Sequence, residues 1–258
     1  MSLGGVLGLA LIEGLIGLVI LAILWPTTRS AARLLGRWGV ADPADAELAA
    51  ALTYLRRRRL WYPWLFLGIG FLVDGTNLLP GNQDNAWSIP AVLLVGALLA
   101  ELFAQRRNTA PVRVAIPLRR GLTDIVPGWA LTLHAIAALS TVVLLGGALT
   151  GVGWAARWYP TWSGRVLWIA LGAAVLSVLV VWVIVGLALR RPAVAEVRID
   201  PLLRTRSARV AIGLGIATLC ALIGSGESDF RGMIILFAGL ICWTAVASPA
   251  RRPAAVPA

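Results

Sequence analysis

Long apolar stretches separated by short polar ones make up most of this chain. A helix needs about 20 apolar residues to cross the hydrocarbon core of a bilayer, and seven stretches approach that length. They are residues 3–25, 60–79, 87–104, 127–150, 166–189, 208–224 and 230–248. The pattern predicts an all-α fold, a polytopic membrane helix bundle with seven transmembrane spans. The last two stretches are short, so they predict either two crossings or a re-entrant hairpin.

The composition agrees with the pattern. Of the 258 residues, 59% are hydrophobic and 14% are charged, and the mean hydropathy is +0.83. Soluble globular domains carry about 25% charged residues. The chain is therefore predicted to be a multi-pass protein of the plasma membrane.

The arginines predict the orientation of the spans. All 23 basic residues are arginine, and 20 of them lie in the tail or in and beside loops 26–59, 105–126 and 190–207. Only Arg157, Arg165 and Arg231 lie in the other connections. Because arginine-rich loops stay on the cytoplasmic side, the sequence predicts an external N-terminus and a cytoplasmic C-terminus.

One membrane domain accounts for nearly all of the chain. Residues 1–248 are predicted to form a single transmembrane helical domain with the three arginine-rich loops on its cytoplasmic side. The tail, residues 249–258, is rich in proline and alanine, which predicts a disordered cytoplasmic segment. Within loop 26–59, Asp42, Asp45 and Glu47 precede an alanine and leucine run that ends in four arginines. This order matches the helix dipole and predicts a cytoplasmic helix before the second span.

Five polar residues inside the apolar stretches are candidates for a functional site. They are Glu13, Asp74, Asn77, Glu101 and His134. Ionisable groups within spans are costly and usually face a bundle interior or a water-filled cavity. Together they would form a proton or cation path; alternatively, they are neutral or hydrogen-bonded packing groups. Glu101 has a further interpretation, since a carboxylate so close to Arg106 would simply lie at the interface.

Aromatic residues gather in the connection between the fourth and fifth stretches. Trp154, Trp158, Tyr159 and Trp162 lie within nine positions of one another. Such rings favour the membrane interface, so the connection is predicted to be an interfacial belt. The alternative is an aromatic lid over an outward-facing cavity.

Several classes of function are excluded or disfavoured. The chain has no lysine and a single histidine, so it contains neither a P-loop lysine nor an HExxH zinc pair. No GxSxG motif is present. We expect no metal or cofactor, and no nucleic acid because no basic module stands apart from the spans. The expected partners are the lipid bilayer, anionic lipids at the arginine-rich loops, and membrane partner subunits.

Three segments carry a resemblance to other proteins. They are Glu101 with Leu102 followed by VRVA at 112–115, LRRGLTDIVPGWA at 118–130, and DPLLRTRSAR at 200–209. The combination resembles a loose set of uncharacterised multi-pass membrane proteins from high-GC actinobacteria. Ile125 and Gly128 depart from that pattern, which more often has tyrosine and arginine there. Some of those proteins accompany transport or regulatory genes, so the resemblance implies an integral membrane protein and leaves its mechanism open.

Three hypotheses for the function follow. The first is a transport-associated or permease-like component, which predicts a polar cavity reaching Glu13 and Asp74. The second is a non-catalytic membrane partner subunit, which predicts a dry bundle. The third is an intramembrane enzyme acting on a lipid or isoprenoid, which predicts a lipid-accessible pocket containing His134, although no catalytic residue is identified.

Overall fold

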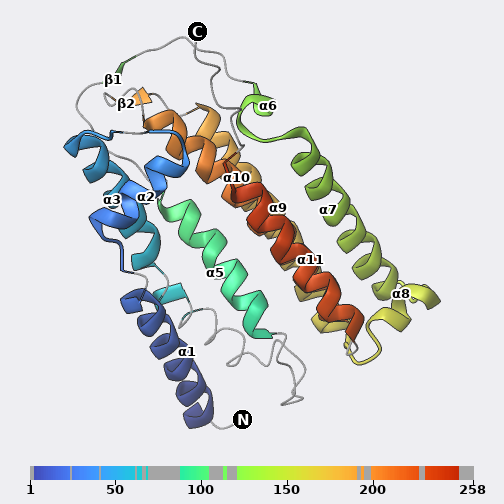
Figure 1. Ribbon diagram of the computed structural model, residues 1–258. Helices are drawn as coiled ribbons and strands as arrows, with labels where there is room; N and C mark the ends of the chain where they lie inside the picture. Colours follow the sequence, from blue (N-terminus) through green and yellow to red (C-terminus); the bar gives the residue numbers. More distant parts are fainter. Residues whose placement is uncertain are drawn as a thin grey trace.

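The computed structural model is all-helical apart from one pair of two-residue strands (Figure 1). It describes residues 3–23, 25–40, 42–61, 63–65, 68, 88–104, 113–114, 121–190, 193–194, 199–226 and 230–249. Side chains of residues 3–7, 9, 10, 13, 16, 20 and 88–92 and of both strands lie outside this description. The helices are α1 (Leu3–Ile23), α2 (Thr28–Arg37), α3 (Asp45–Leu60), α5 (Ser88–Ala104), α6 (Leu122–Ile125), α7 (Gly128–Leu149), α8 (Gly153–Trp158), α9 (Gly164–Arg190), α10 (Asp200–Gly224) and α11 (Phe230–Ala247). Strands β1 (Arg113–Val114) and β2 (Ala193–Val194) pair antiparallel.

Helix α10 is the centre of the bundle. It contacts α5, α7, α9 and α11 (Figure 1), and side chains from Ser207 to Leu219 are buried with one exception. Because lipid offers no hydrophobic driving force between helices, association depends on close packing, which small residues permit. The sequence of α10 supplies them, with glycine or alanine at 211, 213, 215, 217 and 221.

Glycines let α10 and α11 approach closely. A Cβ added at Gly213 would lie 2.7 Å from Cδ1 of Trp243, and one at Gly239 would lie 2.6 Å from Cβ of Cys220. At the far end, a Cβ on Gly224 would lie 2.6 Å from the carbonyl oxygen of Gly232. A side chain at any of these positions would push the two helices apart.

The outer faces of the bundle are apolar. Leu139 on α7, Trp168 on α9 and Ile241 on α11 are each about two-thirds exposed. Four helices are long and apolar enough to cross a membrane: Gly128–Leu149, Gly164–Arg190, Asp200–Gly224 and Phe230–Ala247. Exposed apolar surface around such helices is what a lipid environment requires. The structure is therefore compatible with a membrane protein.

The other three predicted spans are not confirmed. The segment Gly17–Ile23 meets α2 at 78°, and the two would add a fifth span only if they were one broken crossing. The predicted span 60–79 lies mostly outside the described residues, and α5 has 17 residues, the short end of the range for a crossing helix. The count of seven and the orientation of the termini remain predictions.

The predicted loop 190–207 is partly helical. Helix α10 begins at Asp200, with Pro201 in its first turn, so residues 200–207 extend the predicted span by two turns. Proline and an acidic residue both favour a helix N-terminus. Asp200 also pairs with the guanidinium of Arg204 one turn later. The predicted disordered tail, 249–258, lies outside the described residues except for Pro249.

Helices α2 and α3 form a hairpin beside the start of α10. Ala31, Leu35, Ala51 and Leu55 pack with Ile199 in a separate apolar cluster. The predicted helix before the second span is confirmed as α3. Its carboxylate at Glu47 accepts a hydrogen bond of 3.0 Å from the backbone N–H of Ala44, which stabilises the helix start.

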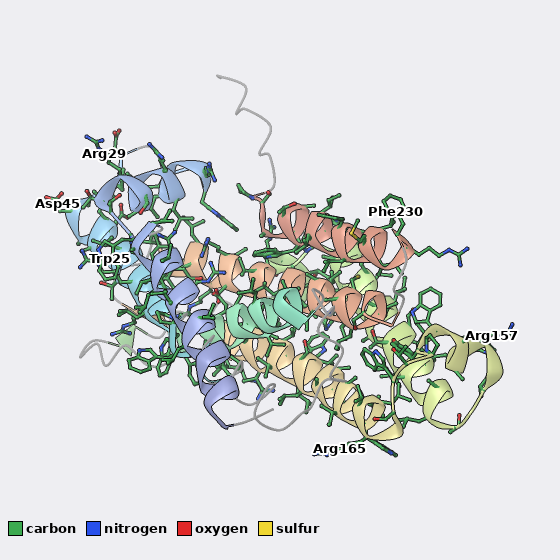
Figure 2. All side chains as sticks on the ribbon, turned by 90° about the horizontal axis from the view of Figure 1, so that it is seen from below. Trp25, Arg29, Asp45, Arg157, Arg165 and Phe230 are labelled. Atoms are coloured by element: carbon green, nitrogen blue, oxygen red, sulfur yellow. The ribbon has the colours of Figure 1, made fainter. Side chains whose placement is uncertain are left out.

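The arginine-rich segments gather at one end of the bundle. Figure 1 shows α2, α3, α6 and the β pair at one end, which we call the arginine-rich end, and α8 at the other. In Figure 2, Arg29 lies on the opposite side of the molecule from Arg157 and Arg165. This separation agrees with the partition of arginines along the sequence. Which end faces the cytoplasm remains a prediction.

Candidate functional site

The structure describes two of the five predicted site residues in full. Glu101 lies on α5 and His134 on α7, and both are buried. Glu13 lies in α1, but its side chain is outside the description, and Asp74 and Asn77 lie outside the described residues. The site can therefore be built around Glu101 and His134.

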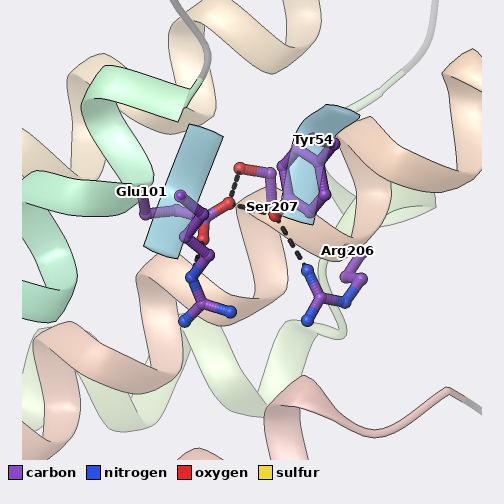
Figure 3. A network of polar contacts seen from close by, with 5 residues as sticks. Tyr54, Glu101, Arg206 and Ser207 are labelled. Carbon is purple, nitrogen blue, oxygen red and sulfur yellow. Dashed lines mark hydrogen bonds and ion pairs between the residues drawn. The ribbon is translucent and has the colours of Figure 1, made fainter. Parts of the chain in front are cut away.

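Glu101 is the hub of a polar cluster at the arginine-rich end. Figure 3 shows its carboxylate among side chains from α3 and α10. We call Tyr54, Arg58, Glu101, Arg206 and Ser207 the Glu101 cluster. It joins three helices that are far apart in the sequence.

The carboxylate is fully buried and well supplied with donors. The hydroxyl of Tyr54 donates to Oε1 over 2.5 Å, and the hydroxyl of Ser207 donates to the same oxygen. Nε of Arg58 lies 2.9 Å from Oε2. Glu101 is 0% exposed, and a charge without partners at such a depth would cost several kcal/mol, about 3–5 when one member of a buried pair is removed. These donors explain why a carboxylate persists here.

Arg206 extends the cluster by one further bond. Its Nη1 donates to the oxygen of Tyr54 over 2.9 Å, and its guanidinium carbon lies 5.3 Å from the centre of the tyrosine ring. A chain of hydrogen bonds thus runs from Arg206 through Tyr54 to Glu101. Burial, and then the negative charge of Glu101, raise the pKa of Tyr54 above its ordinary value. The phenol therefore stays a donor well into the alkaline range.

Local sequence explains how the donors are presented. Tyr54 and Arg58 are four residues apart, so they lie on one face of α3. Arg206 and Ser207 lie in the extra turns of α10 that the sequence interpretation assigned to a loop. Glu101 is buried among protein side chains at the arginine-rich end, and the interpretation that it lies at the membrane interface near Arg106 stays a prediction. The spacing of Tyr54 and Arg58 was the one local sequence signal that could have pointed to this cluster.

Arg209, beside this cluster, donates hydrogen bonds to the C-terminal ends of two helices. Nε of Arg209 donates to the carbonyl of Ile125 over 3.0 Å, and its Nη1 donates to the carbonyl of Ser248 over 3.3 Å. Its guanidinium carbon lies 5.7 Å from the ring centre of Trp38. Cations favour the C-terminal ends of helices because the last carbonyls lack partners. Arg209 thus ties α6 and α11 to α10.

His134 lies where α7, α9 and α10 meet. A Cβ added at Gly215 would lie 2.8 Å from Cε1 of His134 and 2.7 Å from Cγ2 of Val181. The imidazole and the Trp182 ring meet edge to face, with ring centres 6.5 Å apart and planes at 63°. Neither ring nitrogen has a hydrogen-bond partner among the described residues, and the same holds for the hydroxyl of Ser177.

The structure does not bring Glu101 and His134 together. Glu101 binds Ser207 and His134 contacts Gly215, so their contacts on α10 are eight residues apart, about 12 Å at helical rise. The two residues are separate features of the bundle. No shared polar cavity follows from them.

The aromatic connection is anchored to the end of α10. Nε1 of Trp158 donates to the carbonyl of Ile223 over 2.9 Å. The ring of Tyr159 is buried and contacts that of Trp162, with ring centres 4.8 Å apart and planes tilted by 45°. Burial raises the pKa of Tyr159 above its ordinary value. Trp154 is 54% exposed, as an interfacial residue would be. Three of the four aromatic residues, Trp158, Tyr159 and Trp162, therefore pack against the bundle, and neither the lid nor the belt alone describes the connection.

Neither a search for metal ligands nor comparison with known proteins identifies a function for this site. Among the described residues, no group of three or more histidine, cysteine, aspartate or glutamate side chains could hold a metal ion. No family model, curated protein or solved structure matches the chain.

Proposed function

We propose that this membrane protein is a non-catalytic partner subunit of a transport-associated assembly in the plasma membrane. The observation that carries the proposal is the Glu101 cluster. Its ion pair and hydrogen bonds fasten the α2–α3 hairpin to α5 and α10. A hairpin held this firmly is suited to presenting a fixed surface to another molecule.

The packing of the bundle supports the same proposal. Around α10, the described core consists of alanine, valine, isoleucine and leucine. The buried hydroxyls of Thr141 and Thr218 donate to carbonyls of their own helices, over 2.7 and 2.8 Å. Because these hydroxyls already donate within their own helices, they have no free hydrogen-bond donor for a transported solute.

The proposal can be tested by isolating the protein from its native membrane. After mild detergent extraction, we expect it to migrate with a second membrane protein in a fixed ratio. Glu101→Gln, which keeps the shape of the side chain but weakens the attachment of α3, should reduce that ratio while the chain still inserts. A monomer that supports solute flux after reconstitution into liposomes would contradict the proposal.

His134 favours a second candidate, a transporter coupled to protons. A buried imidazole without a described hydrogen-bond partner is unusual, because unpaired buried polar groups cost about 1–3 kcal/mol. Intramembrane histidines commonly belong to proton relays. Under this candidate, His134→Gln or Glu13→Gln would abolish the pH dependence of flux in liposomes and leave insertion unchanged. The enzyme hypothesis gains less support, since Gly215, Val181 and Trp182 beside His134 supply neither a nucleophile nor an acid.

A further inference from the structure

Helix α2 carries a row of arginines that the Glu101 cluster does not use. Arg29, Arg33 and Arg37 are four residues apart, and all three are exposed. The opposite face of the helix holds Ala31 and Leu35, which are 0% and 1% exposed in the hairpin core. The arginines therefore point directly away from the core. We call them the α2 arginine row.

No described carboxylate neutralises this row. The ion pairs in the described part of the chain join Arg58 to Glu101 and Arg204 to Asp200. The acidic residues of the hairpin lie elsewhere, with Asp42 and Asp45 in and after the turn and Glu47 buried at the start of α3. Three like charges along about 12 Å of helix thus form a concentrated positive surface.

Exposed tryptophans place the base of the hairpin at the level of a membrane interface. Trp25, just before α2, is 44% exposed, and Trp64, shortly after α3, is 71% exposed. Tryptophan side chains favour the headgroup layer. Ile23, at the end of α1, is 76% exposed, so the surface changes from apolar to aromatic to cationic between Ile23 and Arg29.

The angle between helices orients the axis of α2 relative to α1. The last turns of α1, Gly17–Ile23, meet α2 at 78°. If α1 follows the bilayer normal, α2 runs nearly parallel to the membrane surface. A helix with three arginines on one face is poorly suited to the hydrocarbon core, where each charge costs about 2.5–3.5 kcal/mol or more. The geometry therefore favours an interfacial helix over the second half of a broken span.

We propose that the α2 arginine row binds the phosphate groups of anionic phospholipids in the leaflet at the arginine-rich end. Guanidinium groups bind phosphate through paired N–H donors, and long arginine side chains reach the headgroups from a helix that lies at the interface. The row would hold the hairpin at this leaflet whether or not a partner subunit binds the protein.

The test measures lipid selectivity around the whole protein. The full chain is reconstituted with spin-labelled phosphatidylglycerol or phosphatidylcholine, and electron paramagnetic resonance gives the fraction of each lipid immobilised by the protein. We expect a preference for phosphatidylglycerol that falls several-fold in the triple variant Arg29→Gln, Arg33→Gln, Arg37→Gln. It should also fall at about 1 M salt, where the Debye length is near 3 Å.

The matched control removes the same charge from the other end. Arg157, Arg165 and Arg231 are exposed, and replacing all three with glutamine should leave most of the preference intact. Circular dichroism should show both triple variants folded, since none of the six side chains is buried. An equal fall in both variants, no fall in either, or complete loss of the preference when inorganic phosphate replaces chloride at constant, low ionic strength would overturn the proposal.

Discussion

Glu101 and His134 are both buried ionisable residues packed against α10, yet their surroundings differ completely. Glu101 has donors from two neighbouring helices, whereas His134 has apolar neighbours and no described hydrogen-bond partner. The difference follows from charge. An ionised carboxylate must be paired when it is buried, whereas an imidazole can remain neutral. The Glu101 region is therefore stabilised by an ion pair and hydrogen bonds, and the His134 region by close packing.

Among the substitutions considered, Glu101→Leu should lower the stability of the folded protein most. Arg58 would lose its counter-charge and Tyr54 and Ser207 their acceptor, and breaking a buried pair typically costs about 3–5 kcal/mol. Thermal unfolding of the purified protein in detergent measures the loss. Glu101→Gln should cost less, and adding Arg58→Leu to Glu101→Leu should recover part of the stability. A Glu101→Leu variant as stable as the wild type would contradict a region held by charge.

Gly215→Ala should cause the second largest loss of stability, through a steric clash and without any change of charge. Its new methyl group would clash with Val181 and His134, and overpacking typically costs about 1–3 kcal/mol. Gly172→Ala on α9 is the matched control, because nothing lies within 4 Å of a Cβ there. Its higher helix propensity should leave stability unchanged or raise it by up to about 1 kcal/mol. Equal melting temperatures for the two variants would show that the His134 contact is loose.

Tyr54→Phe should have a moderate effect that depends on pH. At neutral pH the variant loses the bonds to Glu101 and Arg206, at about 1 kcal/mol each. Because the folded state raises the pKa of Tyr54, its contribution is fully present below the unfolded value near 10 and is lost as the pH rises beyond it. Wild-type stability should therefore fall more steeply than that of the variant above pH 10. Parallel curves would show that Tyr54 ionises freely.

His134→Leu should have the smallest effect on stability. The substitution nearly conserves volume and removes nitrogens that have no described hydrogen-bond partner, so we expect a change within about 1.5 kcal/mol. Thermal unfolding beside Glu101→Leu gives the comparison directly. A loss as large as that of Glu101→Leu would mean that His134 is held by polar contacts after all.

The sequence alone determined the class of the protein and the extent of several helices. Hydropathy depends on consecutive residues, so the apolar stretches at 127–150, 166–189 and 230–248 each coincide with a long helix. The start of α3 could likewise be predicted, because Glu47 caps a backbone group only three residues away. Hydropathy alone missed the start of α10 and placed its first two turns in a loop, although Asp200 and Pro201 are local signals for a helix N-terminus.

Only the tertiary structure decided what the polar residues do. Glu101 meets Tyr54 across 47 positions and Ser207 across 106, and no local pattern encodes such pairs. Judged by its neighbours in sequence, Glu101 lay at the interface; judged by its neighbours in space, it is the most fully partnered of the described candidates. His134 looked like a possible proton carrier, and its imidazole proved to lie against Gly215. The physical reason is that hydropathy is a local sum, whereas burial and pairing of a charge depend on which helices meet.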